Sequence, residues 1–421
     1  MDRPRVRDPP APRARGGYTP PMTSPLTPPV VLWDDGLARL GPLTHTRPAH
    51  DVRTGAFTLR ERMETAGIKA ILTIDAPGGA ALDSIEERLP LGTSEAVVVA
   101  SSCVAHPAAL TAIEPGRRVV DAASGRFVAC RVAREEISSI SRNSFLEGAE
   151  RSEAPCLLER PWDVIRHRDA TLAMDLSLLL ASDRWARQTP PGVVVVGDGR
   201  VAIDPSADVL PSVVLDTSGG PIIIERNATV RPGAILCGPA YIGPFSTVLD
   251  RTLIKANTAI GPVCKVAGEV GGSVFQGFAN KAHDGHLGDS WVGEWANLGA
   301  GTTNSNLLNT YGEITARADA GAPRERTGLN FFGTIVGDHV KTAISTRLFT
   351  GTVLGTGAMI ASTTPPDAST PPFAWVTDAG TKTFRIDKFL DVARLAMARR
   401  DVEMSPDMER QLRELHAKAP S

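Results

Sequence analysis

An aliphatic residue recurs at every sixth position through much of the second half of the chain. A period of six is too long for the alternation of a β-strand and does not fit a helical heptad. It suits a coil with three short faces, each of which buries one aliphatic side chain. We therefore predict a parallel β-helix of hexapeptide repeats from about Ile203 to Thr364. The first unbroken run consists of Ile224, Val230, Leu236, Ile242, Val248, Ile254, Ile260 and Val266.

The six-residue pattern is interrupted twice. It returns at Val292 after a gap at about 267–291, and again at Val336 after a gap at about 305–335. An insertion in a solenoid forms a loop on its surface, where functional residues usually lie. We therefore look for function at these two gaps.

Residues 30–188 show a different pattern, in which short apolar runs alternate with helical stretches. Strands separated by helices predict an α/β domain whose sheet has parallel strands. The expected strands are 30–33, 70–74 and 96–100, and the expected helices are 55–66 and 163–180.

The two ends of the chain differ from the parts between them. Residues 1–29 carry nine prolines and five arginines without a hydrophobic stretch, which predicts a disordered tail. The β-helix domain is placed at 189–365, and a C-terminal helical extension at 366–421. Its second helix is expected to begin with Ser405 as N-cap and Pro406 as the first helical residue.

Composition narrows the possible partners and the compartment. A net charge of −2 over 421 residues gives no general reason to expect nucleic acid or an anionic membrane as a partner. No apolar run approaches the roughly 20 residues of a membrane span. The five cysteines form no Cys-x-x-Cys pair, which argues against a disulfide framework and a structural zinc site. A cytoplasmic location is the simplest expectation.

Two histidines and two asparagines stand out in and just beyond the first gap. His283 and His286 lie three residues apart, and Asn297 and Asn306 follow within the next coils. Together they suggest a polar groove across neighbouring coils that holds a catalytic histidine. The alternatives are asparagines that only line β-helix corners, and histidines that are merely exposed or bind a metal ion.

This stretch resembles the acetyltransferase half of the bifunctional N-acetylglucosamine-1-phosphate uridyltransferase/glucosamine-1-phosphate acetyltransferase family. His283, Asn297 and Asn306 fall on matching positions. His286 stands where that family has a tyrosine. The resemblance implies His283 as the general base, with Asn297 and Asn306 orienting the sugar and the pantetheine arm. Asp284 or Asp289 is the expected partner of the imidazole.

The resemblance extends to residues that would bind the substrate. Arg231, in the run Arg-Pro-Gly-Ala, matches a family arginine. The family lysine eighteen residues later is Leu249 here, and Lys265 or Lys281 is the expected substitute. We therefore expect Arg231, Lys265, Lys281 and His286 to contribute to substrate binding.

A divergent bacterial form of this family, also described as a sugar nucleotidyltransferase, resembles the chain over almost all of 30–400. The resemblance implies a nucleotidyltransferase-like α/β domain at 30–188, followed by a left-handed parallel β-helix with an acyltransferase-like site. The matching motifs are Pro42-Leu-Thr-His-Thr-Arg-Pro, Arg53-Thr-Gly, Pro161-Trp-Asp-Val-Ile, Gly268-Glu-Val and the block from Phe275 to Gly312.

The N-terminal domain keeps only part of a nucleotidyltransferase pattern. Such a domain opens its first strand into a glycine-rich loop that approaches the triphosphate, and this chain has only part of that loop after Asp34. Arg47 and Arg53 are the expected nucleotide-binding residues, since arginines clamp phosphates bidentately. Surface salt bridges are the alternative. Mg²⁺ would be needed to neutralise the leaving pyrophosphate, with Asp121 and Asp175 as candidate ligands.

The leading hypothesis is an enzyme of nucleotide-sugar synthesis, in the UDP-N-acetylglucosamine pathway. It would transfer acetyl from acetyl-CoA to an amino-sugar-1-phosphate in the β-helix, and a nucleotidyl group to a sugar-1-phosphate in the N-terminal domain. One alternative is a sugar-1-phosphate nucleotidyltransferase with a structural β-helix, and another is a non-catalytic scaffold that binds sugar nucleotides. Small molecules are the expected partners.

We also expect a homotrimer, because hexapeptide β-helices of related acyltransferases pack three to a bundle. The motivating observation is apolar material on the β-helix beyond what one solenoid core needs. The residues concerned are Phe245, Phe275, Phe278, Trp291 and Trp295.

Overall fold

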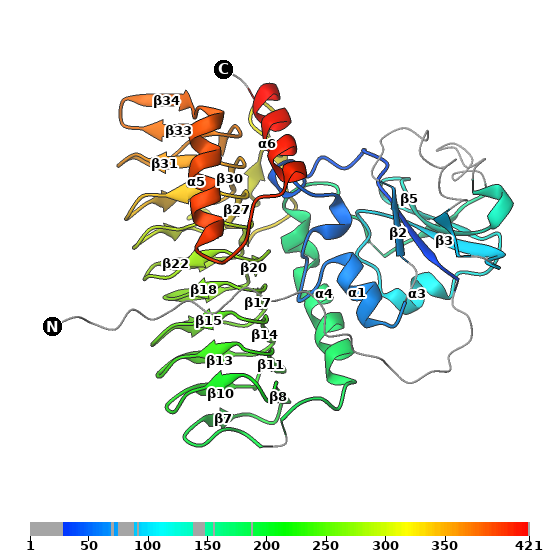
Figure 1. Cartoon of the computed structure of the whole chain (residues 1–421), viewed down its shortest axis with the longest axis horizontal. Helices are drawn as coiled ribbons and strands as arrows, with labels where there is room; N and C mark the ends of the chain where they lie inside the picture. The colour runs from blue at the N-terminus through cyan, green and yellow to red at the C-terminus, as the bar shows by residue number, and fades with distance from the viewer. Residues whose placement is uncertain are drawn as a thin grey trace.

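The computed structural model describes residues 28–68, 71–74, 88–90, 92–137, 148–154, 156–186 and 188–419. Almost all of the predicted N-terminal tail lies outside these ranges. Figure 1 shows a column of stacked coils with the N-terminal domain beside it and helix α4 between the two. Within the described residues, no helix is long and apolar enough to cross a membrane.

The N-terminal domain is built on one mixed sheet of six strands in the order β2-β1-β3-β5-β4-β6. β1 runs parallel to β2 and β3, as predicted, whereas β5 runs antiparallel to β3 and β4. The prediction of parallel strands was therefore wrong at this edge. β4 and β5 follow one another through a short turn, and such a turn can join only antiparallel strands. The strands are β1 (Val30–Trp33), β2 (Ile71–Ile74), β3 (Glu95–Ala100), β4 (Arg118–Asp121), β5 (Phe127–Ala133) and β6 (Glu150–Ser152).

The described residues of this domain include the helices α1 (Leu59–Thr65), α3 (Pro107–Thr111) and α4 (Asp163–Leu180). α4 has the predicted bounds. α1 starts later than predicted because Thr58 caps it, accepting a hydrogen bond from the Glu61 backbone N–H. α1 and α4 are joined by a fully buried ion pair in which Arg62 Nε lies 2.6 Å from an Asp175 carboxylate oxygen.

The second part of the chain is a parallel β-helix, as predicted, with strands stacked in three sheets. Regular coils are 18 residues long, so that Val230 pairs with Val248 and Val248 with Val266. The coils begin at β7, within the expected domain 189–365, and end at β33, beyond that domain. The predicted C-terminal helical extension at 366–421 contains β32, the last strand of the nine-stranded sheet.

The nine-stranded sheet forms what we call the covered face. Its strands are β8 (Val201–Ile203), β11 (Ile222–Ile224), β14 (Ala240–Ile242), β17 (Thr258–Ile260), β20 (Val274–Phe275), β23 (Trp291–Val292), β27 (Thr334–Val336), β30 (Thr352–Leu354) and β32 (Ser369–Thr370). A six-stranded sheet forms a second face. Its strands are β7 (Val194–Val196), β10 (Val214–Asp216), β13 (Ile235–Cys237), β16 (Leu253–Ile254), β19 (Glu269–Gly271) and β22 (His286–Gly288).

The third face, which we call the polar face, consists of a five-stranded sheet and its four-stranded continuation. Its strands are β9 (Asp208–Val209), β12 (Thr229–Val230), β15 (Thr247–Val248), β18 (Lys265–Val266), β21 (Asn280–Lys281), β28 (Lys341–Thr342), β31 (Met359–Ala361), β33 (Ala374–Thr377) and β34 (Gly380–Thr383). The remaining strands form two pairs: β24 (Thr303–Asn304) with β29 (Arg347–Leu348), and β25 (Thr315–Ala316) with β26 (Glu325–Arg326).

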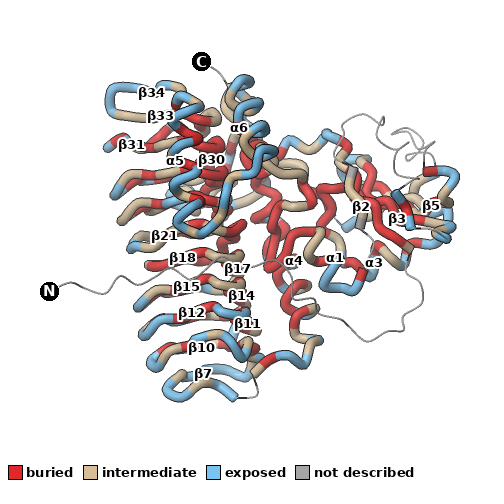
Figure 2. The backbone as a smooth tube through the Cα atoms, viewed as in Figure 1, coloured by how far each residue is buried: buried red, intermediate tan, exposed pale blue. Residues whose placement is uncertain are grey.

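The covered face binds the N-terminal domain. Its outward side chains are apolar and buried against α4 and the loop before α1, and Figure 2 shows this junction as buried. The Trp291 indole N–H donates to the Arg53 carbonyl at 3.1 Å across the junction. The outward residues of this face are Ala202, Ile223, Tyr241, Ala259, Val274, Trp291, Ile335 and Val353.

The second gap in the repeat is an excursion that holds the N-terminal domain. β25 and β26 pair as an antiparallel hairpin within it. The Arg160 Nε, just before α4, lies 2.8 Å from a Glu325 carboxylate oxygen of this hairpin. Phe332, at the end of the excursion, packs into the same apolar junction as the covered face. The second gap therefore serves the contact between the domains.

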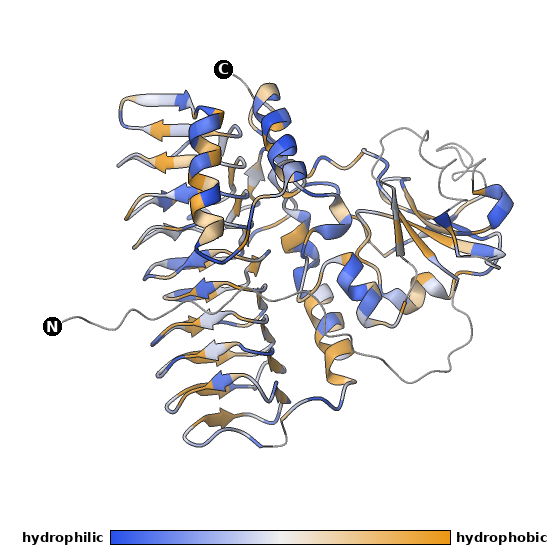
Figure 3. Cartoon of the chain, in the orientation of Figure 1, coloured by the Kyte–Doolittle hydropathy of each residue, from blue (hydrophilic) through white to orange (hydrophobic). Residues whose placement is uncertain are grey.

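Helices α5 (Ile386–Ala398) and α6 (Pro406–Lys418) fold back onto the β-helix. α6 begins as predicted, with Ser405 accepting a hydrogen bond from the Met408 backbone N–H. Figure 3 shows hydrophobic and hydrophilic stretches alternating along both helices, as expected of helices with one buried face. On α5 the buried face consists of Phe389, Leu390, Ala393 and Met397.

The apolar residues that motivated the trimer have partners within the chain. Phe275 lies in the β-helix core, and Trp291 lies under the N-terminal domain. Phe278 and Trp295 stack with ring centroids 4.4 Å apart, close to α5. Phe245 is half-buried beside the Arg226 guanidinium. Intrachain packing therefore accounts for this observation, and the trimer stays a prediction.

Candidate functional site

Four polar residues form a ladder on the outside of the polar face, in successive coils. Lys265 pairs with Asn280, Asn280 with Asn297, and Asn297 with Lys341. Neighbouring strands are about 4.8 Å apart, so the ladder spans about 14 Å and has a lysine at each end. We call these four residues the polar ladder. The sequence predicted two of them, Lys265 and Asn297.

His283 lies in the corner that follows β21, and its side chain is exposed. It borders two hollows. The first, of about 550 Å³, is lined by the ladder residues Lys265, Asn280 and Asn297 and by Arg399 and Arg400 at the end of α5. We call it the ladder groove. Its remaining lining includes no carboxylate.

The second hollow beside His283, of about 560 Å³, is lined by Asp250 and Asp284 and by small apolar side chains. We call it the acidic groove. Ala300 and Ile344 border both hollows, as His283 does. The histidine therefore stands at the boundary between a cationic and an acidic depression.

Arg231 and Lys281 do not line the ladder groove. Arg231 is exposed and forms an ion pair at 3.4 Å with Asp250 at the edge of the acidic groove. Lys281 points into the β-helix core, with 1% of its surface exposed. Its ammonium donates to the Ala267 carbonyl at 3.0 Å and to the His283 carbonyl at 2.9 Å. Burial lowers the pKa of Lys281 from its usual 10.5 to about 8. In this structure Lys281 therefore does not present its amine to a substrate.

His286 and Asn306 lie together on the six-stranded side of the β-helix. A Cβ atom on Gly288 would lie 2.7 Å from both the His286 Nε2 and the Asn306 amide nitrogen. The His286 Nδ1 lies 3.5 Å from a Glu269 carboxylate oxygen. Asn306 donates to Asp289 at 2.7 Å, and the same carboxylate binds Arg168 at 2.7 Å. Asp289 is therefore committed to other partners, and Asp284 is the remaining candidate beside His283.

Asn280, Arg399 and Arg400 line the groove but were missed from the sequence, as was Lys341 at the end of the polar ladder. Lys341 was detectable, because it precedes an inward position of the repeat as Lys265 does. Burial lowers the pKa of Lys341. The Arg400 guanidinium donates to the Asn280 side chain at 2.8 Å. The sequence could not have predicted this contact, because the two residues are 120 positions apart.

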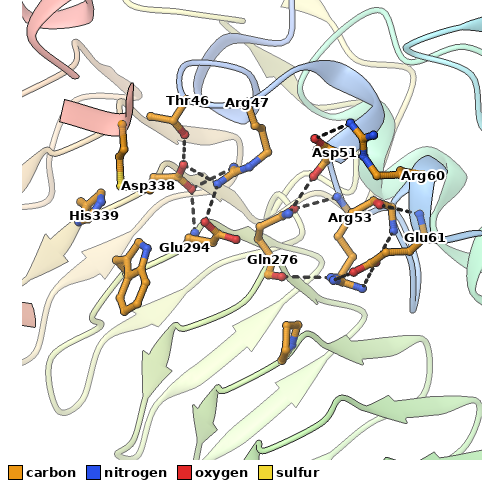
Figure 4. Close-up of a pocket in the computed structure, with 14 residues that line it drawn as sticks. Thr46, Arg47, Asp51, Arg53, Arg60, Glu61, Gln276, Glu294, Asp338 and His339 are labelled. Atoms are coloured by element: carbon orange, nitrogen blue, oxygen red, sulfur yellow. Dashed lines mark hydrogen bonds and ion pairs between the residues drawn. The ribbon is translucent and has the colours of Figure 1, made fainter. Parts of the chain in front are cut away.

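Figure 4 shows the surroundings of Arg47 and Arg53, around a cavity of about 350 Å³ between the N-terminal domain, the β-helix and α6. The Arg47 guanidinium lies 2.7 Å from Asp338 and 3.2 Å from Glu294, both on the β-helix. Burial lowers the pKa of Arg47, and the two carboxylates raise it. The carboxylates together have the larger effect, so the pKa is raised. Arg53 lies 3.0 Å from Glu61 and donates to the Gln276 carbonyl at 3.1 Å.

Both arginines therefore have partners that a phosphate would have to displace. The salt-bridge alternative describes what they do in this structure, and their role in nucleotide binding stays a prediction. The candidate metal ligand Asp175 is occupied by Arg62. Asp121 accepts hydrogen bonds from the backbone and hydroxyl of Ser124. Among the described residues, no three His, Cys, Asp or Glu side chains gather closely enough to hold a metal ion.

Comparison with known proteins identifies the class of the N-terminal domain. Residues 30–184 match the family model for sugar nucleotidyl transferases. Parts of the chain are similar, at low identity, to bifunctional enzymes whose names pair a nucleotidylyltransferase with an acetyltransferase. The resemblance predicted from the motifs is confirmed at this level.

Two of these relatives give the extent of the similarity. The bifunctional sugar-1-phosphate nucleotidylyltransferase/acetyltransferase of Sulfurisphaera tokodaii is 30% identical over 153 residues, which are 34% of this chain and 35% of the relative. The bifunctional protein GlmU of Sorangium cellulosum is 27% identical over 259 residues, which are 59% of this chain and 49% of the relative. The chain thus spans between a third and a half of these relatives.

Solved structures with hexapeptide β-helices also align with this chain. The UDP-N-acetylglucosamine acyltransferase of Francisella novicida aligns over 54% of this chain and 91% of its own, with 12% identity and a TM-score of 0.29. The acetyltransferase domain of PglB from Neisseria gonorrhoeae, in complex with acetyl coenzyme A, aligns over 85% of this chain and 100% of its own. Its identity is 12% and its TM-score 0.18. The β-helix itself is established by the strand register of this chain.

Proposed function

We propose that this protein is a transferase of nucleotide-sugar synthesis. Its β-helix transfers an acetyl group from acetyl-CoA to an amino-sugar-1-phosphate. Its N-terminal domain transfers a nucleotidyl group to a sugar-1-phosphate, as in the UDP-N-acetylglucosamine pathway. The observation that carries the proposal is the position of His283, at the boundary of the ladder groove and the acidic groove. The named activities of the similar bifunctional enzymes support the same reading.

In the proposed reaction, His283 is the general base. An ammonium group cannot attack a thioester, so the amine must lose a proton as its nitrogen bonds to the acetyl carbonyl carbon. The His283 imidazole takes that proton, the carbon–sulfur bond breaks, and the thiolate of CoA leaves and is protonated. General-base catalysis of this kind typically contributes about 10²–10⁴ in rate. In this proposal Asn297, which is exposed and lines the ladder groove with His283, donates from its amide to the oxygen on which negative charge develops.

The charges of the two grooves suit the charges of the proposed substrates. The ladder groove presents Lys265, Arg399 and Arg400, and lysine and arginine are the side chains that bind phosphate. The acidic groove presents Asp250 and Asp284, which favour the ammonium form of an amino sugar before it reacts. His283 between the grooves would meet the amine where the two substrates come together.

The predicted roles of His286 and Asn306 require the substrate to reach the six-stranded side of the β-helix. Arg231 would act only at the outer edge of the acidic groove, through Asp250. The roles of these three residues in substrate binding stay predictions. His286 is accordingly a suitable control for His283, since it is a histidine of the same loop region that lies outside both grooves.

The test compares wild type with His283→Ala for acetyl-CoA-dependent thiol release over a panel of amino-sugar-1-phosphates. We expect turnover to fall by about 10²–10⁴, with folding and CoA binding retained. His286→Ala changes a predicted substrate-binding residue and not the general base, so it should alter KM and keep most of kcat. Equal turnover in wild type and His283→Ala would remove the assignment. No turnover in any protein would favour a nucleotidyltransferase with a structural β-helix.

The nucleotidyltransferase activity is supported by the family match over residues 30–184. A requirement for Mg²⁺ belongs to the proposal, but the described carboxylates do not form a site that fits the ion, and we assign no step to it. Calorimetry with UTP and dTTP on wild type and Arg53→Ala tests the nucleotide clamp. Arg131, another ion-paired arginine of the same domain, provides the control. A larger loss of nucleotide affinity in Arg53→Ala than in Arg131→Ala would support the nucleotide clamp. Equal affinities would contradict it.

Two further parts of the proposal concern assembly and location. A homotrimer would be consistent with the free six-stranded face, where Val194 and Val196 are 52% and 44% exposed. Light scattering at micromolar concentration should give three times the chain mass, and a monomer would remove the idea. A cytoplasmic location would match the supply of acetyl-CoA and sugar phosphates, and cell fractionation tests it.

A further inference from the structure

Lys281 occupies a position that most other coils fill with an aliphatic side chain. The inward row of the polar face places Val266 in the coil before it and Leu298 in the coil after it, both in the hydrophobic core. Lys281 stands between them with 1% of its surface exposed. A buried ammonium is unfavourable unless its hydrogen bonds are satisfied and a charge compensates it. Its presence in the core therefore calls for an explanation.

The amine of Lys281 bonds to two successive corners of the β-helix from inside. One acceptor is the Ala267 carbonyl at 3.0 Å, and the other is the His283 carbonyl at 2.9 Å. The space is kept free by Gly268, where a Cβ atom would lie 3.0 Å from the Lys281 Nζ. Gly268 also has a φ of 76°, which favours glycine. The corner that carries His283 is thus fixed to the preceding coil through a lysine.

The His283 side chain depends on this backbone for its direction. Its imidazole forms no hydrogen bond or ion pair with any described residue, and it is exposed between the two grooves. A catalytic base must be held within hydrogen-bond reach of the proton it takes, and an error of about 1 Å is costly. Since no side chain orients His283, the position of its backbone decides where the imidazole stands.

We propose that Lys281 is a positioning residue for acetyl transfer, fixing the His283 corner from inside the β-helix through its hydrogen bond to the His283 carbonyl. This inference rests on the proposed function. It replaces the expectation that Lys281 binds substrate. It also explains why the core keeps an amine here, since a valine or leucine would fill the space but leave the carbonyl without its donor.

The experiment replaces Lys281 by the apolar side chains that suit its row, as Lys281→Met and Lys281→Leu. Replacing a buried charged group by an apolar one of similar size is often neutral or stabilising. We therefore expect a melting temperature no lower than that of wild type, with kcat reduced about tenfold or more and KM for both substrates within about twofold. Lys265→Met, which changes the outward lysine of the preceding coil, should instead raise KM.

Two results would overturn the proposal. One is a wild-type kcat in a folded Lys281→Met protein. The other is a fall in kcat that parallels a fall in melting temperature in both variants, since a merely structural lysine gives that pattern. The variants and wild type are each measured as the full chain, at the same protein concentration.

A second readout separates this inference from the proposed function. Diethyl pyrocarbonate acylates accessible imidazoles, and mass spectrometry of the modified protein gives the rate at each histidine. We expect the rate at His283 to change by about threefold or more in Lys281→Met, while the rate at His286 stays the same. If wild type showed no acetyl transfer, the proposed function would fail and this rate would still test the corner. An unchanged rate at His283 would overturn the positioning role.

Discussion

The covered face and the polar face are built from the same repeat and have opposite surfaces. On the covered face, the outward residues of the coils are apolar and buried, as Ile223 and Trp291 show. On the polar face, the corresponding positions carry Lys265, Asn280 and Asn297. The inward residues of both faces are mostly apolar and form one core, with Lys281 as an exception. The difference teaches that the repeat specifies the coil, whereas the outward residue of each strand decides what the face binds.

Trp291 is the residue whose loss should affect the covered face most. It is fully buried at the junction of the two domains, and its indole bonds to the Arg53 carbonyl. Trp291→Ala should lower the free energy of unfolding by about 3–5 kcal/mol, because the packed side chains of the junction cannot fill the cavity. Urea unfolding measures the change. Trp375→Ala, on the polar face and 41% exposed, is the matched control and should lose about 1 kcal/mol. Equal losses would mean that the two faces do not differ in this way.

Lys281 gives the core under the polar face a dependence on pH. Its pKa is lowered by burial from the usual 10.5 to about 8, so between these values the unfolded chain binds a proton that the folded chain does not. The penalty is therefore fully present below about pH 8 and disappears as the pH rises to about 10.5. The stability of wild type relative to Lys281→Met should rise by about 3 kcal/mol over that window.

The measurement is urea unfolding of wild type and Lys281→Met at several values between pH 7 and pH 10.5. Taking the difference between the two proteins cancels the groups they share. A difference that does not change with pH would show that the Lys281 amine is not protonated differently in the two states. Lys255→Met, at a half-exposed lysine paired with Glu269 on the six-stranded face, is the control for the loss of a surface lysine.

The ladder itself should affect binding far more than stability. Lys341→Gln removes the cation at one end of the ladder, and we expect CoA affinity to fall by about tenfold, as for the loss of one hydrogen bond to a charged group. Lys341 is partly exposed, so the free energy of unfolding should change by less than about 0.5 kcal/mol. Calorimetric titration with CoA measures the first quantity. An unchanged affinity, equal to that of Lys255→Gln, would mean that this end of the ladder does not contact the phosphates.

The elements of the fold were predictable where the pattern is local. α4 has the predicted bounds. The start of α6 was predicted correctly from Ser405 as N-cap and Pro406 as the first helical residue. The antiparallel β5 was not predicted, because a buried strand has the same composition whichever way it runs. The aliphatic run did not extend back to β7, because one coil between them is longer: Leu236 pairs with Leu215, 21 residues before it.

The candidate site was predictable only in part. His283, Asn297 and Lys265 meet at one groove, as the resemblance implied. His286 and Asn306 lie on another face, because a strand reverses the direction of side chains between neighbouring positions and a corner turns the chain to the next sheet. Lys281 follows Asn280 directly, and that single step places it inside the coil.

The sequence by itself determined the coil. Each aliphatic residue of the repeat packs against residues of the coils immediately before and after it. A spacing of 18 residues brings these neighbours into register. Only the tertiary structure decided which face would be covered and where the groove would close. Arg47 meets Asp338, and Arg400 meets Asn280, across 291 and 120 residues of chain. Such contacts depend on how whole domains pack, because no local pattern records the partner of an outward side chain.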